Sequence, residues 1–193
     1  IQTILDKWLE IDFYYVADKI GFIKKDVLPD KKLIMETIRC LDYITTRRKE
    51  EEKNITITLI ALMWTYIDKK EYDIKAIVIK FLSRIGYPTS AIIVDDMFDK
   101  DECKFSAIDS LIDQITIGFN QMKNEVNIGE HTLLLTDFQK RIWDVMDNEK
   151  VIGISAPTSA GKSYVILMKV IQRLNVEKLD VVYIVPTLSL LNQ

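Results

Sequence analysis

Residues 156–163 of the chain read Ala156-Pro157-Thr158-Ser159-Ala160-Gly161-Lys162-Ser163, which matches the phosphate-binding loop pattern except that alanine stands in place of the first glycine. A tight loop that enters a helix points several backbone N–H groups inward, and the helix dipole favours negative charge there. Gly161 allows close backbone approach, Lys162 supplies a charge for the β- and γ-phosphates, and the Ser163 hydroxyl can ligate the bridging Mg²⁺. The loop therefore predicts nucleotide binding, and the alternative is a surface turn that happens to contain Gly-Lys-Ser.

The segments on either side of this loop favour a βαβ unit. Residues 151–155 form a short apolar run typical of a strand, residues 163–174 have a helical pattern, and residues 181–185 form a second β-branched run. Strands joined through a helix are expected to lie parallel, with a right-handed crossover. The sequence thus predicts an α/β fold that contains the start of a parallel sheet.

The chain before this unit has the pattern of a series of helices. Glycines number only 6 and prolines 4, so few residues interrupt a helix. Two segments place apolar side chains three and four residues apart, as expected for helix faces that pack in a core. These side chains are Ile74, Ile77, Val78, Phe81, Leu82 and Ile85 in the first segment, and Phe105, Ile108, Ile112, Ile115, Phe119 and Met122 in the second. The almost wholly apolar residues 57–67 predict a central buried helix.

A loop at residues 127–130 separates these two patterns. We therefore expect an all-helical N-terminal domain at residues 1–130. The first part of the α/β domain is expected at residues 131–193.

Composition narrows the classes of function. With 26 basic and 29 acidic residues the net charge is −3, so any contact with nucleic acid has to be local. Cys40 and Cys103 lie outside any CxxC pattern, which favours free thiols over a disulfide or a zinc site. His131 has no partners at metal spacing and is expected to be solvated. The apolar run at residues 55–67 is too short for a bilayer, so we expect a cytoplasmic protein without membrane contact.

The loop and its upstream flank resemble superfamily 2 helicases, especially the DEAD/DEAH-like branch. Residues 156–163 look like motif I of that family, where alanine at position 156 is expected. Upstream, Leu135-Thr136-Asp137-Phe138-Gln139 resembles the element whose glutamine recognises adenine. An amide offers a donor and an acceptor together, so Gln139 can pair with the N6 and N7 edge of adenine. The alternative for Gln139 is an exposed polar residue on a helix.

Residues 185–193, which read Val-Pro-Thr-Leu-Ser-Leu-Leu-Asn-Gln, are similar to motif Ia of the same family, which contacts the nucleic-acid backbone. The resemblance implies that Pro186 and Thr187 bind nucleic acid, although Leu188 stands where many relatives carry arginine or lysine. The alternative is an ordinary strand-to-helix cap.

The resemblance covers residues 133–193 and implies a RecA-like ATP-binding domain, with ATP and Mg²⁺ as cofactors and DNA or RNA as partner. It makes Lys162 and Ser163 the catalytic residues and Ser163 the Mg²⁺ ligand. Asp95-Asp96 precedes the loop, whereas the acidic pair of the family follows motif Ia. Two parallel strands also cannot bury both faces of a sheet. We therefore expect the N-terminal part of a longer helicase, which by itself binds nucleotide without efficient hydrolysis.

Two other functions remain open. One is a P-loop ATPase of another class, in signalling or remodelling, because many ATPases use the same phosphate cradle. The other is a helical docking module, although apolar stripes usually build a domain's own core. The arrangement of a helical domain before a RecA-like ATP-binding domain is also similar to that of bacterial antiphage defence helicases. This resemblance implies a nuclease subunit as partner.

Overall fold

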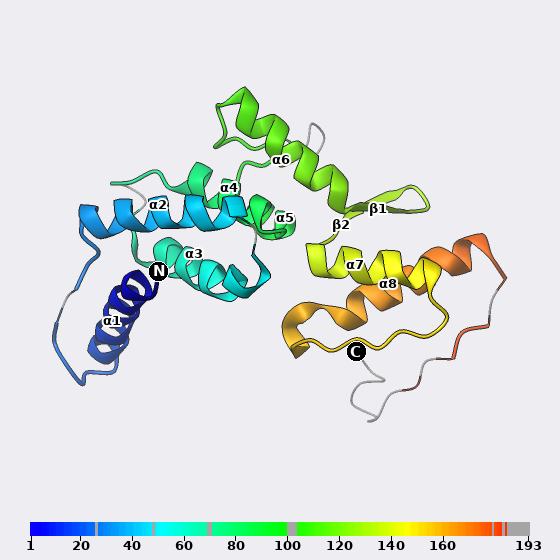
Figure 1. Ribbon diagram of the computed structural model, residues 1–193, viewed down its shortest axis with the longest axis horizontal. Helices are drawn as coiled ribbons and strands as arrows, with labels where there is room; N and C mark the ends of the chain where they lie inside the picture. The colour runs from blue at the N-terminus through cyan, green and yellow to red at the C-terminus, as the bar shows by residue number, and fades with distance from the viewer. Residues whose placement is uncertain are drawn as a thin grey trace. The chain divides into compact units, whose positions relative to one another are not determined.

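The computed structural model of the protein describes residues 1–25, 27–47, 49–68, 71–99, 104–178, 180–182 and 184 (Figure 1). The chain divides into two compact units, Ile1–Asn124 and Glu125–Gln193. The described residues are mostly helical, and their one sheet is a two-stranded antiparallel hairpin.

The first unit is helical throughout its regular elements, as the sequence predicted. Its elements are α1 (Gln2–Lys19), α2 (Lys31–Arg47), the 3-10 turn η1 (Glu50–Glu52), α3 (Lys53–Tyr66), α4 (Lys75–Arg84), α5 (Pro88–Val94) and α6 (Leu111–Asn124). Local signals place several ends. The Asp30 carboxylate accepts a hydrogen bond from the Leu33 N–H at 2.6 Å at the start of α2. Proline stands in the first turn of α5, and Gly86 follows α4 with φ 83°.

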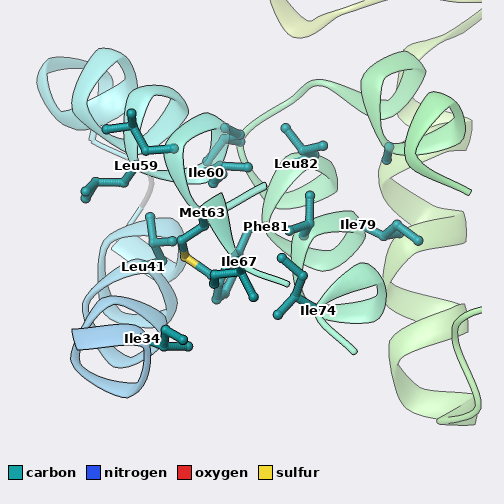
Figure 2. Close-up of a cluster of buried hydrophobic side chains, with 14 of the residues drawn as sticks. Ile34, Leu41, Leu59, Ile60, Met63, Ile67, Ile74, Ile79, Phe81 and Leu82 are labelled. Atoms are coloured by element: carbon teal, nitrogen blue, oxygen red, sulfur yellow. The ribbon is translucent and has the colours of Figure 1, made fainter. Parts of the chain in front are cut away.

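The core of this unit is built around α3. Figure 2 shows Leu41 of α2, Met63 of α3 and Phe81 of α4 among the buried side chains that gather between the helices. The indole N–H of Trp8, on α1, donates to the Thr37 hydroxyl at 2.8 Å. A buried polar atom therefore has a partner, as a packed interior requires. The central helix predicted at residues 57–67 is thus observed as α3.

The apolar stripe predicted at residues 105–122 differs from the observed packing. Phe105 and Ile108 are buried, but they precede α6. Within α6 it is Ile117 that is buried, while Ile112, Phe119 and Met122 are 76%, 68% and 67% exposed. The expectation that the whole stripe lies in the core was therefore wrong.

Polar contacts between α6 and α4 account for the difference between the expected and the observed orientation of α6. Asp113 pairs with Lys80 of α4 at 2.8 Å, and the Asn120 amide donates to the Ser83 hydroxyl of α4 at 3.2 Å. These residues share a helix face with Ile117, because they are separated from it by three or four positions. The polar anchors therefore direct the apolar stripe away from α4.

The second unit contains a hairpin followed by two helices. Its elements are β1 (Glu125–Ile128), β2 (His131–Leu134), α7 (Asp137–Asn148), the 3-10 turn η2 (Thr158–Ala160) and α8 (Lys162–Val176). Val126 pairs with Leu133, and Ile128 with the exposed His131. The loop expected at residues 127–130 therefore contributes its first half to β1, while Gly129 makes the turn with φ 59°.

The predicted parallel strands are not formed in the described structure. Residues 151–157 have no strand partner, nor do residues 181, 182 and 184. Val151 is 90% exposed. A parallel pair requires neighbours on both faces, whereas an antiparallel hairpin closes locally through a short turn. The hairpin is therefore the sheet that this part of the chain makes.

The core of the second unit lies between the hairpin, α7 and α8. Its buried members are Val126, Ile128, Leu135, Ile142, Trp143 and Val165. As for membrane contact, none of the described helices has the length and apolarity needed to cross a bilayer.

Candidate nucleotide-binding site

The predicted phosphate loop changes conformation step by step before it enters α8. Pro157 is extended, with ψ 154°, and η2 follows with the Ala160 N–H bonded to the Pro157 carbonyl at 3.1 Å. Gly161 then adopts a left-handed conformation with φ 71° and ψ 29°. Residues with a side chain rarely adopt this conformation, because Cβ approaches the backbone carbonyl oxygen. The loop therefore depends on glycine at position 161.

The Lys162 ammonium lies across this loop. It donates to the carbonyl oxygens of Ala156 and Pro157, the latter at 2.6 Å. A lysine side chain is a compact charge on a flexible stem, so it can exchange carbonyl oxygens for phosphate oxygens. The structure thus places a positive charge against the carbonyl oxygens of the loop.

The start of α8 offers further hydrogen-bond donors. The Ser163 side chain is exposed in the first turn, and no side chain caps this helix in the described structure. First-turn N–H groups lack partners within a helix, and the dipole adds positive potential at the same end. These donors fit a polyphosphate, and the exposed hydroxyl fits a Mg²⁺ ligand.

Gln139 has a structural role that the sequence analysis missed. The Thr136 hydroxyl accepts a bond from the Gln139 N–H at 3.3 Å, and the Gln139 amide oxygen accepts one from the Thr136 N–H at 3.0 Å. This reciprocal pair is a capping box that starts α7. The spacing Thr-x-x-Gln before an apolar helix was the available signal. Gln139 is also half-buried and not an exposed polar residue.

The fold brings Gln139 and the phosphate loop together. A Cβ atom at Gly161 would lie 2.5 Å from Nε2 of Gln139, well inside van der Waals contact. Since the amide oxygen of Gln139 is held by Thr136, its NH₂ group is the end that lies against the loop. The oxygen keeps a second lone pair for another donor. Two regions that the sequence linked only by resemblance are therefore in direct contact.

Contacts between α7 and α8 continue along both helices (Figure 1). The Lys169 side chain of α8 lies 4.4 Å from the centroid of the Trp143 ring, and its ammonium is 2.7 Å from the Asp147 carboxylate. The Arg173 guanidinium donates to the Met146 carbonyl. Because the first turns meet at Gln139 and Gly161, and the later turns meet at these residues, the helices run in the same direction.

The remaining predicted residues fall into two groups. Ser159 is exposed and Ala160 is half-buried within η2, to which Thr158 contributes its backbone. Pro186 and Thr187 lie outside the described residues, as does Cys103.

Cys40 is a free thiol whose pKa is raised by burial. Within the described ranges, no three His, Cys, Asp or Glu side chains gather in a way that would hold a metal.

The comparisons with known proteins bear on the segment that contains this site. Residues 136–193 match the family model described as DEAD/DEAH box helicase. Neither the curated proteins nor the solved structures gave a match. The matched segment begins at Thr136, the cap of α7, and it includes Gln139 and the whole phosphate loop. Residues 136–193 of this chain are therefore similar to the DEAD/DEAH box helicase family, and the segment is helicase-like at the level of superfamily 2.

Proposed function

We propose that the protein is an ATP-dependent nucleic-acid helicase or translocase whose phosphate loop binds ATP with Mg²⁺. The observation that carries this proposal is the contact between Gln139 and Gly161 in a segment that matches the DEAD/DEAH box family. A phosphate loop alone occurs in many ATPases. A glutamine amide held beside that loop adds a group that can distinguish one base from another.

Each residue of the site has a chemical task in this proposal. The backbone N–H groups of residues 156–163 bind phosphate oxygens, and Lys162 releases the loop carbonyls in order to neutralise the β- and γ-phosphates. The Ser163 hydroxyl ligates Mg²⁺, which supplies charge stabilisation to the phosphates when bound. Gln139 reads adenine with its NH₂ group and with the second lone pair of its oxygen.

We also propose that the second unit, which begins at Glu125, is the start of a RecA-like ATP-binding domain that follows the helical first unit. An exposed apolar face of α8 supports this. The face consists of residues three and four positions apart, away from the α7 contact: Tyr164, Leu167, Ile171 and Leu174. A parallel sheet from residues 151–155 and 181–185 would cover it, as helices cover such sheets in α/β proteins.

The nucleic acid itself belongs to the same proposal. The segment that contains Pro186 and Thr187 would contact its backbone, with the Thr187 N–H and hydroxyl as hydrogen-bond donors, because proline has no N–H to donate. The partner is DNA or RNA, because backbone contacts of this kind serve both. Efficient hydrolysis would need acidic and arginine groups outside residues 156–163, since phosphoryl transfer depends on them.

The test is ATP hydrolysis by the full-length protein with and without single-stranded and duplex DNA and RNA, beside Lys162→Ala. We expect stimulation by one nucleic acid and a loss of about 100-fold in kcat in Lys162→Ala, because a charge that meets the transferred phosphate is removed. The matched control is Lys150→Ala, an exposed lysine in the same unit, which should retain activity. Lys162-dependent hydrolysis that no nucleic acid stimulates would contradict the helicase and support the signalling or remodelling ATPase.

A further inference from the structure

Lys169 is a buried charge in the contact between α7 and α8. Its side chain is 2% exposed, although its partner Asp147 is half-exposed. A lysine at such a position costs free energy unless its charge is paired, and an apolar residue of similar size packs there equally well. Packing alone therefore does not account for lysine here. Lys169 instead makes two specific contacts with α7: the ion pair with Asp147 and the contact with the Trp143 ring. Both contacts require one particular placement of α7 against α8.

The helix that Lys169 contacts, α7, also carries Gln139, the residue proposed to read the base. Trp143 and Asp147 follow Gln139 by one and two turns on α7, and Lys169 follows Gly161 by two turns on α8. The Gln139–Gly161 contact and the Lys169 contacts are thus two points of attachment between the same pair of parallel helices. If α7 rotated or slid against α8, the Asp147 carboxylate would leave Lys169 and the Gln139 amide would leave the loop.

Adenine and guanine differ at the position that Gln139 would contact. Adenine presents an N6 donor beside the N7 acceptor, whereas guanine presents the O6 and N7 acceptors. The bond from the Thr136 N–H holds the amide oxygen of Gln139, so the amide cannot turn over to suit guanine. Discrimination then depends on the distance of this fixed amide from the loop, which the register of α7 on α8 decides.

We propose that Lys169 is a positioning residue for base selection: it fixes the register of α7 on α8 and so holds the Gln139 amide in place to favour adenine over guanine nucleotides. This inference rests on the proposed function, since Gln139 has to read the base. Lys169 itself touches no nucleotide. Its removal should alter selectivity for the base and leave binding of the phosphates intact.

The experiment measures dissociation constants of the full-length protein for ADP, GDP and inorganic tripolyphosphate by calorimetry. Wild-type protein should bind ADP about tenfold or more tightly than GDP, because one or two net hydrogen bonds contribute a free energy of that size. In Lys169→Met the ratio should fall to below about threefold, while tripolyphosphate affinity stays within about twofold. Lys169→Arg should restore the preference, because arginine can pair with Asp147 and stack on Trp143. Lys80→Met, which removes a lysine–aspartate pair between α4 and α6, is the matched control.

A double mutant tests the route through Gln139. Gln139→Ala alone should lower the ratio, and adding Lys169→Met should change it no further, because both remove the same interaction. If Lys169→Met does not fold, Asp147→Asn weakens the same pair from its half-exposed side.

The inference is overturned if Lys169→Met keeps the ADP preference, if the double mutant loses more than either single variant, or if tripolyphosphate affinity falls with nucleotide affinity. Equal wild-type affinity for ADP and GDP, still dependent on Lys162, would overturn this inference and the base-reading role of Gln139, while the proposed binding of phosphate by the loop would stand. Absence of nucleotide binding by the wild-type protein would instead overturn the proposed function.

Discussion

Two features require glycine at position 161: its backbone conformation and the close approach of the Gln139 side chain. Its positive φ disfavours any side chain, and the space where a Cβ would lie belongs to the Gln139 amide. Lys162 follows Gly161 directly in the chain and contacts the loop carbonyl of Ala156. Gln139 is distant in sequence and lies against Gly161 in space. The conformation of a single glycine therefore couples the proposed phosphate site to Gln139, the residue proposed to read the base.

Gly161→Ala is expected to weaken ADP binding and to lower the free energy of unfolding of the second unit by about 1–2 kcal/mol, the cost of a left-handed alanine. The control is Gly153→Ala, where a Cβ would meet nothing within 4 Å and no positive φ is required. Denaturant titration and calorimetry measure the two effects. Equal behaviour of the two variants would show that the loop does not require the left-handed conformation.

Asp95 is a buried carboxylate that organises the turn between α5 and α6. It is 3% exposed and accepts bonds from the Ser106 hydroxyl and N–H, both at 2.6 Å, and from the N–H groups of Met97 and Ala107. Burial by itself would raise the pKa of Asp95, but these donors outweigh burial and lower the pKa below its usual value. Its role is therefore structural, consistent with its place before the phosphate loop.

The lowered pKa determines how stability depends on pH. The ionised form stabilises the fold above the unfolded pKa of about 3.9, and this stability is lost as pH falls through the lower folded pKa. Asp95→Asn should therefore cost about 2 kcal/mol at pH 7, and the difference from wild type should shrink as the pH falls below about 4. Asp96→Asn, whose side chain is 79% exposed, is the control and should cost less than about 0.5 kcal/mol. Urea unfolding across pH measures both, and a pH-independent difference would contradict this account.

Among the elements, α6 shows how a helix can be predicted while its orientation is not. Its apolar residues at helical spacing predicted a helix, and a helix is present. The face that packs was decided by Asp113 and Asn120, whose partners Lys80 and Ser83 lie on α4. Their contribution could not be read from periodicity, because it depends on polar groups on another helix.

This orientation predicts opposite results for two neighbouring apolar residues. Ile117→Ala should lower the free energy of unfolding by about 2–4 kcal/mol, because it leaves a cavity in the core. Phe119→Ala should change it by less than about 0.5 kcal/mol, since the ring is already largely in water. Chemical denaturation of the two variants measures the contrast. A larger loss in Phe119→Ala would mean that the stripe packs as the sequence predicted.

At the scale of the molecule, the two compact units have separate hydrophobic clusters. One cluster is formed by residues between Trp8 and Ile117, and the other by residues between Val126 and Val165. No buried residue belongs to both in the described structure. Clusters of this kind generally unfold as separate cooperative units.

Separate cores predict separate responses to core mutations. Leu59→Ala, at a fully buried position of α3, should destabilise the helical unit by about 2–5 kcal/mol and leave the dissociation constant for ADP within about twofold of wild type. Trp143→Ala should do the reverse, weakening ADP binding without altering hydrogen exchange in α3. Hydrogen exchange resolved by segment, with calorimetry, checks both. Loss of ADP binding in Leu59→Ala would show that the units fold as one.

The amino-acid sequence was sufficient to predict a helical first unit, a helix that follows Gly161, and the likeness of residues 133–193 to superfamily 2 helicases, which the family match to residues 136–193 confirms. These features depend on local spacing: apolar residues every three or four positions, sparse glycine and proline, and a loop motif whose residues are adjacent.

Three features could be seen only in the folded chain. They are the face of α6 that packs, the hairpin at residues 125–134 with no strand at 151–155, and the contacts by which Gln139 and Lys169 hold α7 against the loop and α8. The physical reason is that each of these depends on free energy shared between segments distant in sequence. A strand requires a partner, a buried lysine requires a carboxylate, and a helix face packs where its neighbour offers a match.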